Sequence, residues 1–443
     1  MRTEATKREA GVLLQALSAG VVPRVGLRHI AVGRQREVEA LVDDLELVEN
    51  GGAAFRFVVG RYGSGKSFLI QLIRNYAMEK KFVVMDADLS PERRLAGTKG
   101  QGLGTYRELV QHISIQSKPD GGAMESVLQT WIASIQREVA QKTGVDSKDV
   151  RLVEMVSDRI KEDMRSLTEM AHGFAFSEVL DVYWRAVKTG NDEQKQVALR
   201  WLRGEFANKT AARNSGLNVD SVITDGNWYD FLKLFAAFTK KAGFKGLVVY
   251  LDEGVNLYKI QNKISRSNNY EKLLTMYNDC MQGKAHNIAI IMSGTDQFVY
   301  DESRGLFSYE ALRSRLNSNN YLDKGYVDYS APVLMLKRIS DEELFVLLER
   351  LRDIHAKRYG YEAKLSSADL EVYLNFALSR IGADEFLTPR EITKMFIEIL
   401  NILEQHPEAS FYDLISTKGN DLKGPDIDPD ALNDDIFAEL DDL

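Results

Sequence analysis

The chain has 443 residues, of which 44% are hydrophobic and 28% are charged. This composition is ordinary for a soluble globular protein, and the length favours two or three domains over one. The net charge of −8 equals the eight acids of residues 426–443, a segment without Lys or Arg. Residues 1–425 are therefore neutral overall, and their charge neither favours nor excludes a nucleic-acid partner.

Three features argue against a membrane or secreted protein. No run of about 18 apolar residues, the length that crosses a bilayer, is present. The N-terminal sequence MRTEATKREA mixes acids with bases and leads into no apolar segment, which is untypical of a secretory signal. The single cysteine, Cys280, cannot form an internal disulfide. We therefore expect no membrane contact and a cytoplasmic location.

The first ninety residues predict helices and strands in alternation. Apolar residues at helical spacing predict a helix over 1–20 and another over 35–48. Residues 55–59 predict a buried strand, 66–80 a helix and 82–88 a second strand that ends in acids. A strand, a helix and a strand at this spacing indicate a βαβ unit and a parallel sheet.

Residues 105–240 are almost wholly helical in pattern. This length is too great for one crossover between strands, so we interpret it as a helical insertion. Strand patterns return at 246–253 and at 287–295, and Pro332 begins the stretch PVLMLKRIS.

The remaining chain predicts a smaller helical domain, with helices over 340–359, 366–381 and 389–405. Beyond residue 416 the sequence is acidic and loses its periodicity, so we expect disorder there. The predicted organisation is listed in chain order: an N-terminal helix over 1–28, a nucleotide-binding domain over 29–335, a helical lid over 336–415 and an acidic tail over 416–443.

The strongest motif is GRYGSGKS, Gly60 to Ser67, which fits G-x-x-x-x-G-K-[ST] between a predicted strand and a predicted helix. Glycines allow the backbone N–H groups to surround phosphate oxygens, and the helix N-terminus adds a positive dipole end. Lys66 would reach the β- and γ-phosphates of ATP, and Ser67 would bind Mg²⁺. We expect the nucleotide to contact Gly60, Arg61, Tyr62, Gly63, Ser64, Gly65, Lys66, Ser67 and Phe68. The alternative, a chance glycine-rich turn, fits the flanking elements poorly.

Two further strands end in polar residues. GLVVYLDE places Asp252 and Glu253 at the end of a buried strand. In a P-loop enzyme the aspartate completes the Mg²⁺ shell and the glutamate activates water, although alone such a strand end is more often only solvated. NIAIIMSGT ends in Ser293 and Thr295, either of which could orient that water. An ordinary turn is the alternative, and the functional interpretation is favoured. The sequence does not choose between Ser293 and Thr295.

YEALRSRL at 309–316 contains Arg313 and Arg315, two residues apart. Such arginines are usually solvated surface residues. They can instead supply positive charge to a nucleotide bound by a neighbouring subunit. From the motif alone, the surface interpretation is favoured.

The order of these motifs resembles the AAA+ ATPases, close to the initiator and signalling-NTPase branches. HIAVGRQREVEAL at 29–41 resembles the segment that lines the adenine side there, which implies roles for Val32, Gly33 and Arg34. RSRL resembles the initiators' arginine-finger motif, which implies Arg315 as the finger with Arg313 as reserve. LTPREITKMF at 387–396 resembles a sensor motif of the lid, which implies that Arg390 lies near the γ-phosphate.

A narrower resemblance is to the P-loop proteins of BREX-type bacterial phage-defence loci, the BrxD-like group. The stretches that carry it are VGRYGSGKSFL, VVYLDEGVNLYKI, IMSGTDQF and RGLFSYEALRSRL, together with the helical insertion. Genes of that group typically neighbour a large helicase. The resemblance implies a DNA-related ATPase that works with partner proteins.

The sequence therefore predicts an α/β protein with an AAA+-like P-loop core, a parallel sheet, a large helical insertion and a C-terminal helical lid. The main hypothesis is an oligomeric ATPase, with ATP and Mg²⁺ as cofactors, acting on DNA in phage defence. Residues 185–213 carry a net charge of +4 with Trp184 and Trp201 nearby, but a solvated helix face with core tryptophans is favoured over a DNA surface. The alternative function is a signalling NTPase that switches slowly and binds proteins only; a metabolic kinase is disfavoured.

Overall fold

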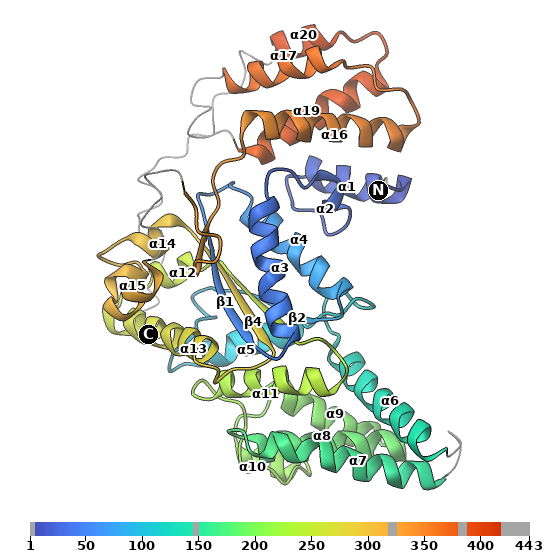
Figure 1. The fold of residues 1–443 in the computed structure, drawn as a ribbon, viewed down its shortest axis with the longest axis vertical. Helices are drawn as coiled ribbons and strands as arrows, with labels where there is room; N and C mark the ends of the chain where they lie inside the picture. The colour runs from blue at the N-terminus through green and yellow to red at the C-terminus, as the bar shows by residue number, and fades with distance from the viewer. Residues whose placement is uncertain (1–4, 145–149, 318–325, 380–387, 418–443) are drawn as a thin grey trace. The chain divides into compact units, whose positions relative to one another are not determined.

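The structure, a computed structural model, describes residues 5–144, 150–317, 326–379 and 388–417. The chain divides into two compact units (Figure 1). The larger is Arg34–Lys337, and the smaller combines Met1–Gly33 with Arg338–Leu443. The chain passes from one unit to the other at 33/34 and at 337/338. The domain boundaries that we expected after residues 28 and 335 stay predictions. Most of the expected acidic tail lies outside the described residues.

The larger unit contains a five-stranded sheet in which every neighbouring pair is parallel, in the order β2-β3-β4-β1-β5. The strands are β1 (Ala53–Val59), β2 (Val83–Asp88), β3 (Leu247–Asp252), β4 (Ile288–Gly294) and β5 (Val333–Met335). This confirms the predicted α/β class and the parallel sheet. Because helices cover both faces, the strands are apolar almost throughout, as their sequences indicated.

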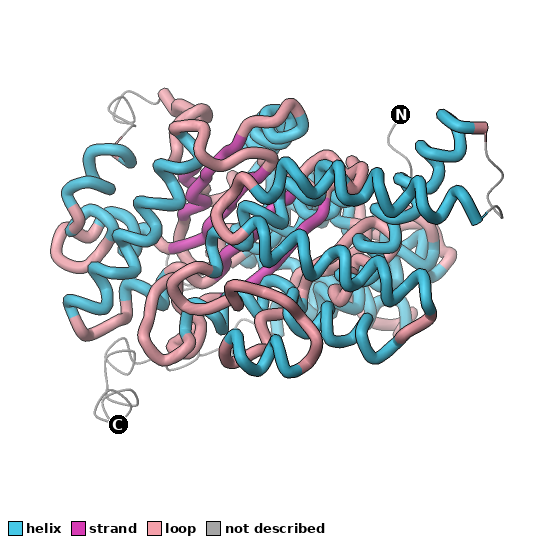
Figure 2. Tube along the Cα trace, turned by 90° about the horizontal axis from the view of Figure 1, so that it is seen from below, coloured by secondary structure: helices cyan, strands magenta, loops and turns pink. Residues whose placement is uncertain are grey.

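Alternate residues of β1 point to opposite faces of the sheet. Ala54 and Val58 belong to a core with α3 (Gln35–Glu49) and α4 (Lys66–Glu79). Phe55 and Phe57 belong to the larger core on the other face. That core also receives α5 (Gln101–Gln111), α11 (Trp228–Lys241) and α13 (Lys263–Met281). Figure 2 shows the strands in magenta between helices.

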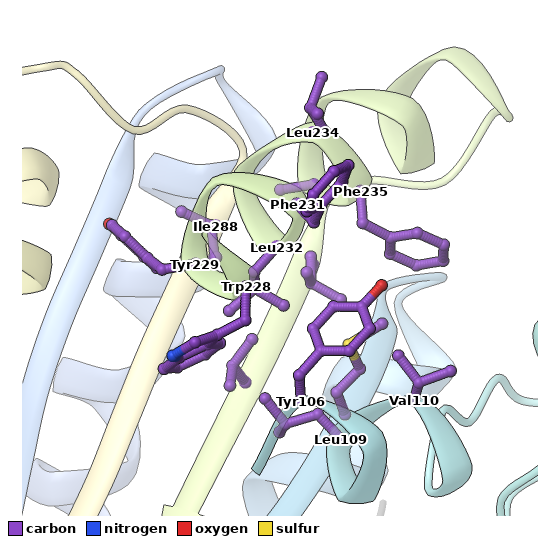
Figure 3. Packing of buried hydrophobic residues seen from close by; sticks show 14 of the residues in the cluster. Tyr106, Leu109, Val110, Trp228, Tyr229, Phe231, Leu232, Leu234, Phe235 and Ile288 are labelled. Carbon is purple, nitrogen blue, oxygen red and sulfur yellow. The ribbon is translucent and has the colours of Figure 1, made fainter. Parts of the chain in front are cut away.

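The centre of the larger core is formed by aromatic residues of α11. Trp228, Phe231 and Phe235 lie beside Tyr106 of α5 in Figure 3 and are almost fully buried. Two of these residues carry a polar atom, and each atom has a hydrogen-bond partner. Trp228 Nε1 donates to the Leu95 carbonyl (3.1 Å), and the Tyr106 hydroxyl donates to the Leu202 carbonyl (2.8 Å). The insertion is thus joined to the sheet through a continuous apolar core.

The region predicted as a helical insertion is mainly helical in its described residues. Between α5 and α11 it contains α6 (Met124–Thr143), α7 (Val150–Thr168), α8 (Gly173–Thr189), α9 (Asp192–Leu202) and α10 (Lys209–Asn214). Trp184 and Trp201 are buried in its core, as the favoured interpretation expected. Four short elements follow β3 and β4: α12 (Val255–Tyr258), α14 (Asp296–Tyr300), the 3₁₀ turn η1 (Leu306–Ser308) and α15 (Glu310–Leu316).

The smaller unit is helical. It contains α1 (Lys7–Ser18), α2 (Leu27–Ile30), α16 (Asp341–Tyr359), α17 (Ser367–Leu378), α19 (Pro389–Gln405) and α20 (Phe411–Thr417). Capping boxes begin four of these helices, at Thr6, Ser340, Ser366 and Thr388. Within this unit α1 packs against α16 and α19, so residues from the two ends of the chain share one core.

Candidate functional site

The carboxyl ends of the central strands bring the predicted site residues to one edge of the sheet. In the strand register Val58 lies opposite Ser293, and Val59 lies opposite Gly294. Asp88 at the end of β2 lies opposite Asp252 at the end of β3. Since β4 neighbours both β1 and β3, the loop after β1 and the acids after β3 flank the end of β4. Crevices of this kind are where open α/β sheets bind ligands.

The loop between β1 and α4 has the backbone that its glycines predict. Gly63 and Gly65 have φ angles of 78° and 91°, in the left-handed region that favours glycine. A Cβ atom on Gly60 would lie 2.6 Å from Ser64 Oγ, so the turn needs glycine there. Beside Gly65, in contrast, a Cβ would meet nothing within 4 Å. The amino end of α4 therefore faces open space in which an anion fits.

The Lys66 ammonium lies within electrostatic reach of three carboxylates. Its Nζ donates to the carbonyl oxygens of Gly60 (2.7 Å) and Arg61 (2.9 Å). Burial lowers the pKa of Lys66, and the charges of Asp252, Glu253 and Asp296 oppose that shift. Lysine and strand-end acids thus share one site, which is the arrangement that the nucleotide hypothesis requires.

Asp252 is held by its neighbours. The Ser293 hydroxyl and the Glu253 backbone N–H (2.8 Å) both donate to Asp252 Oδ1. Ser293 is buried, whereas the Thr295 hydroxyl accepts from the Phe298 N–H (3.3 Å) and so caps α14. Of the two polar residues that the sequence left open, Ser293 is the one that contacts an acid of the site.

Glu253 differs from an ordinary surface glutamate. Its φ angle is 57°, a left-handed conformation that non-glycine residues adopt at a cost of order 1 kcal/mol and that is common at functional sites. Burial raises the pKa of Glu253, and the charges of Asp252 and Asp88 raise it further. The pKa of Asp88 is raised for the same two reasons, burial and Asp252. A carboxylate with a raised pKa is a stronger base.

Two buried polar atoms at this edge have no hydrogen-bond partner in the described structure: Ser64 Oγ in the loop and Asp296 Oδ1 after β4. Buried polar atoms are nearly always paired with protein, water or a ligand, so these two are suited to contact a bound polar molecule. Sequence reasoning did not select Asp296 or Asp88. The only local signal for Asp296 was its position shortly after the strand end, in the sequence SGTD.

The described residues include no group of three or more His, Cys, Asp or Glu side chains arranged to hold a metal ion. Mg²⁺ does not require one, because it usually takes one or two protein ligands and completes its shell with phosphate and water. The Ser67 hydroxyl, exposed in the first turn of α4, and the Asp252 carboxylate are suitable ligands. The residues present therefore fit a magnesium–triphosphate.

The other predicted residues make different contacts or belong to the smaller unit. Arg313 pairs with Glu302 (2.7 Å), and Arg315 donates to Asn278 Oδ1 (2.8 Å). Both arginines are exposed on α15. Val32, Gly33 and Arg390 belong to the smaller unit, where Arg390 lies in the first turn of α19.

Arg34 belongs to the larger unit, and its guanidinium donates to the Ser64 carbonyl of the loop (2.9 Å). The predicted roles of Arg313 and Arg315 in a second subunit, of Arg390 at the γ-phosphate, and of Val32, Gly33 and Arg34 at adenine stay predictions.

A parallel sheet, a glycine loop before a helix and an acidic strand end define an α/β protein with a core like that of P-loop NTPases. The chain belongs to the family described as BREX system ATP-binding protein BrxC/D, which it matches over residues 5–419. This confirms the resemblance to the BrxD-like group and indicates an ATP-binding role in phage defence, with other components of that system as partners. A comparison with curated proteins gives no match. In the described ranges, none of the helices has the length and apolar character that crossing a bilayer requires.

Proposed function

We propose that this protein is a cytoplasmic AAA+ ATPase that binds Mg·ATP at Gly60–Ser67 and hydrolyses it. The observation that carries the proposal is the position of the Lys66 ammonium beside Asp252 and Glu253, at the edge where the glycine loop opens. A lysine that spans the phosphates and an aspartate that holds Mg²⁺ must meet around one triphosphate.

The residues divide the chemistry between them. On binding, Lys66 would exchange its two carbonyl partners for phosphate oxygens of ATP. Ser67 and Asp252 would hold Mg²⁺, which would supply positive charge to those oxygens. Glu253 accepts the proton of the attacking water, and its raised pKa suits that task. Ser293 keeps Asp252 oriented through its hydroxyl.

Assembly completes the proposed site. Arg315, or Arg313 in its place, acts on the nucleotide of a neighbouring subunit, and Arg390 approaches the γ-phosphate from the lid. The exposure of both α15 arginines leaves them accessible to a second copy of the chain.

The work that ATP drives is a DNA transaction in phage defence, with a helicase or another defence protein as partner. Family membership supports this proposal. The basic segment 185–213 supports DNA contact only weakly, since Lys195 pairs with Glu125 (3.2 Å) and Arg200 and Arg203 both pair with Glu205. The alternative is a signalling NTPase that uses ATP as a slow switch for protein partners.

An ATPase assay with and without single- and double-stranded DNA, run beside a mass measurement of the ATP-bound protein, tests the proposal. Turnover that DNA stimulates supports the main proposal. Turnover indifferent to DNA, together with a change from monomer to oligomer on ATP, supports the signalling alternative. Failure to bind or hydrolyse ATP under either condition contradicts both.

A further inference from the structure

The chain passes between its two units at Gly33–Arg34 and at Lys337–Arg338. Arg34 is therefore the first residue of the larger unit, and it is buried, with 8% of its surface exposed. From Nη2 its guanidinium donates to the carbonyl oxygens of Ser64 (2.9 Å) and Lys337 (2.7 Å). One side chain thus joins the phosphate loop to the residues at which the chain enters and leaves this unit.

Arginine is well suited to this position. Its planar guanidinium carries five N–H donors in a fixed fork and stays charged. Nη1 contacts Glu37 (3.2 Å), three residues later in the first turn of α3, so the buried charge has a buried counter-charge. Lysine at this position would keep the charge but not the fork, and therefore could not hold three acceptors in the same geometry.

The bond to Ser64 has a consequence for the next peptide. In a trans peptide unit the C=O and N–H bonds point in opposite directions. Because the Ser64 carbonyl faces Arg34, the N–H of Gly65 faces away from Arg34. Gly65 has a φ angle of 91° and is the N-cap residue of α4, and a Cβ there would meet only open space. The arginine therefore helps to set the direction of a loop donor that a phosphate would use.

Gly63 and Gly65, on either side of Ser64, accept many backbone conformations, so the direction of the Ser64–Gly65 peptide depends on the hydrogen bonds that hold it. On the β5 side, the Leu336 N–H donates to the Val59 carbonyl (2.7 Å) just before the loop. The residue after Leu336 is Lys337, whose carbonyl Arg34 holds. Hydrogen bonds thus link the phosphate loop and the strand before it to the end of the unit, both through β5 and through Arg34.

We propose that Arg34 is a positioning residue that holds the Ser64–Gly65 peptide ready for the triphosphate and couples nucleotide binding to the chain crossings between the two units. This inference rests on the proposed ATP site. It predicts that the relative position of the units responds to nucleotide, and that the response depends on Arg34.

The experiment compares two variants at this position with a matched control. Arg34→Lys keeps the charge opposite Glu37, and the double variant Arg34→Gln with Glu37→Gln removes both buried charges together, which spares the fold an unpaired ion. Arg36→Gln is the control. Arg36 makes the equivalent pair with Glu39 (3.3 Å) on the same helix, but the exposed fractions of these two side chains are 74% and 46%. Thermal unfolding verifies that each variant is folded.

Two readouts separate coupling from a merely structural role. The first is the affinity for adenylyl imidodiphosphate, an ATP analogue that resists hydrolysis. The second is energy transfer between dyes on the exposed positions of Lys284→Cys in the larger unit and Glu371→Cys in the smaller one. The native thiol interferes little, because Cys280 is buried and burial raises its pKa to about 12.

In the wild-type protein and in Arg36→Gln, the analogue should change the energy transfer. In both Arg34 variants the affinity should fall about tenfold, equivalent to about 1.4 kcal/mol. At saturating analogue, the change in energy transfer should fall to less than half. The inference is overturned if either folded Arg34 variant shows the full wild-type change in energy transfer. It is also overturned if the wild-type protein binds the analogue without any change in energy transfer. A wild-type protein that binds no analogue overturns the proposed function itself, and the coupling with it.

Discussion

At the scale of single residues, the candidate site depends on a lysine and several acids that different strands bring together. The pattern G-x-x-x-x-G-K-S and the acids at the end of β3 were visible in the sequence, because loop glycines and strand ends leave local signals. The bond from Ser293 to Asp252 and the position of Asp296 near Lys66 were not, because both depend on the register of strands distant in sequence. Likewise, nothing local marked Arg34 as a partner of Ser64.

Replacing Lys66 by alanine should abolish tight ATP binding. Each charge-assisted bond to a phosphate contributes about 1.5–3 kcal/mol, so losing two should weaken binding by roughly a hundredfold or more. Titration calorimetry with ATP and Mg²⁺ measures this. Lys80→Ala is the control, since Lys80 is exposed at the other end of the same helix. Equal affinity in Lys66→Ala and wild type would show that Lys66 does not touch the phosphates.

At the scale of elements, the periodicity of apolar residues predicted most helices and strands within a few residues. The helices α16, α17 and α19 begin at capping boxes that the sequence displays. Short elements such as α12, α14 and η1 were not predicted, because one turn carries no periodic pattern. The segment after β2, over 89–100, has no regular structure and is held by side chains from distant helices.

One of these side chains is Asn269 of α13, which is fully buried. Its Oδ1 accepts from the N–H groups of Leu95 and Ala96, both at 2.9 Å. Asn269→Ala leaves these two donors unpaired, at about 1–3 kcal/mol each, so the free energy of unfolding should fall by roughly 2–6 kcal/mol. Chemical denaturation measures the loss. Asn268→Ala, at the exposed neighbouring position, should change it by about 0.5 kcal/mol or less; equal losses in the two variants would contradict the assigned bonds.

The smaller unit should lose stability in mild acid through His355. This histidine is buried between the Tyr361 hydroxyl (2.7 Å) and Asn401 Oδ1 (2.9 Å), and burial lowers its pKa. The unfolded chain therefore binds a proton at a higher pH than the folded one, so stability is full above about pH 6.5 and falls as the pH drops below it.

Urea unfolding between pH 5 and 8 should show a shallower fall for His355→Gln than for the wild type. His406→Gln, at an exposed histidine of the same unit, should follow the wild type. If the stability of His355→Gln and of the wild-type protein depends on pH in the same way, His355 is not the source of the loss of stability in acid.

At the scale of the whole molecule, the parallel sheet and the helical insertion followed from the order of predicted elements, but the division into units did not. The pairing of α1 with α16 and α19 joins residues more than 300 positions apart, and no local pattern reports such a contact. The strand order also had to come from the structure, since the sequence predicted only that the strands are parallel.

Assembly through the nucleotide sites can be tested by mixing two inactive variants. Arg315→Ala lacks the proposed trans arginine, and Lys66→Ala lacks the proposed phosphate ligand. If Arg315 acts across an interface, mixed assemblies contain some sites with both groups intact, and part of the ATPase activity should return. Absence of recovery at every ratio, with mixed assemblies confirmed by mass, would assign Arg315 to a role within its own subunit or to none.

The most direct test of the account is a single-turnover reaction, in which excess protein is mixed with ATP and Mg²⁺ and the bound nucleotide is identified over time. The wild-type protein should convert bound ATP to ADP and phosphate, as should Glu271→Gln, a change at an exposed glutamate of α13. Glu253→Gln should bind ATP and retain it unhydrolysed, because it keeps the phosphate and Mg²⁺ ligands but loses the base. Hydrolysis by Glu253→Gln at the wild-type rate, or no bound ATP in the wild-type protein, would contradict the account.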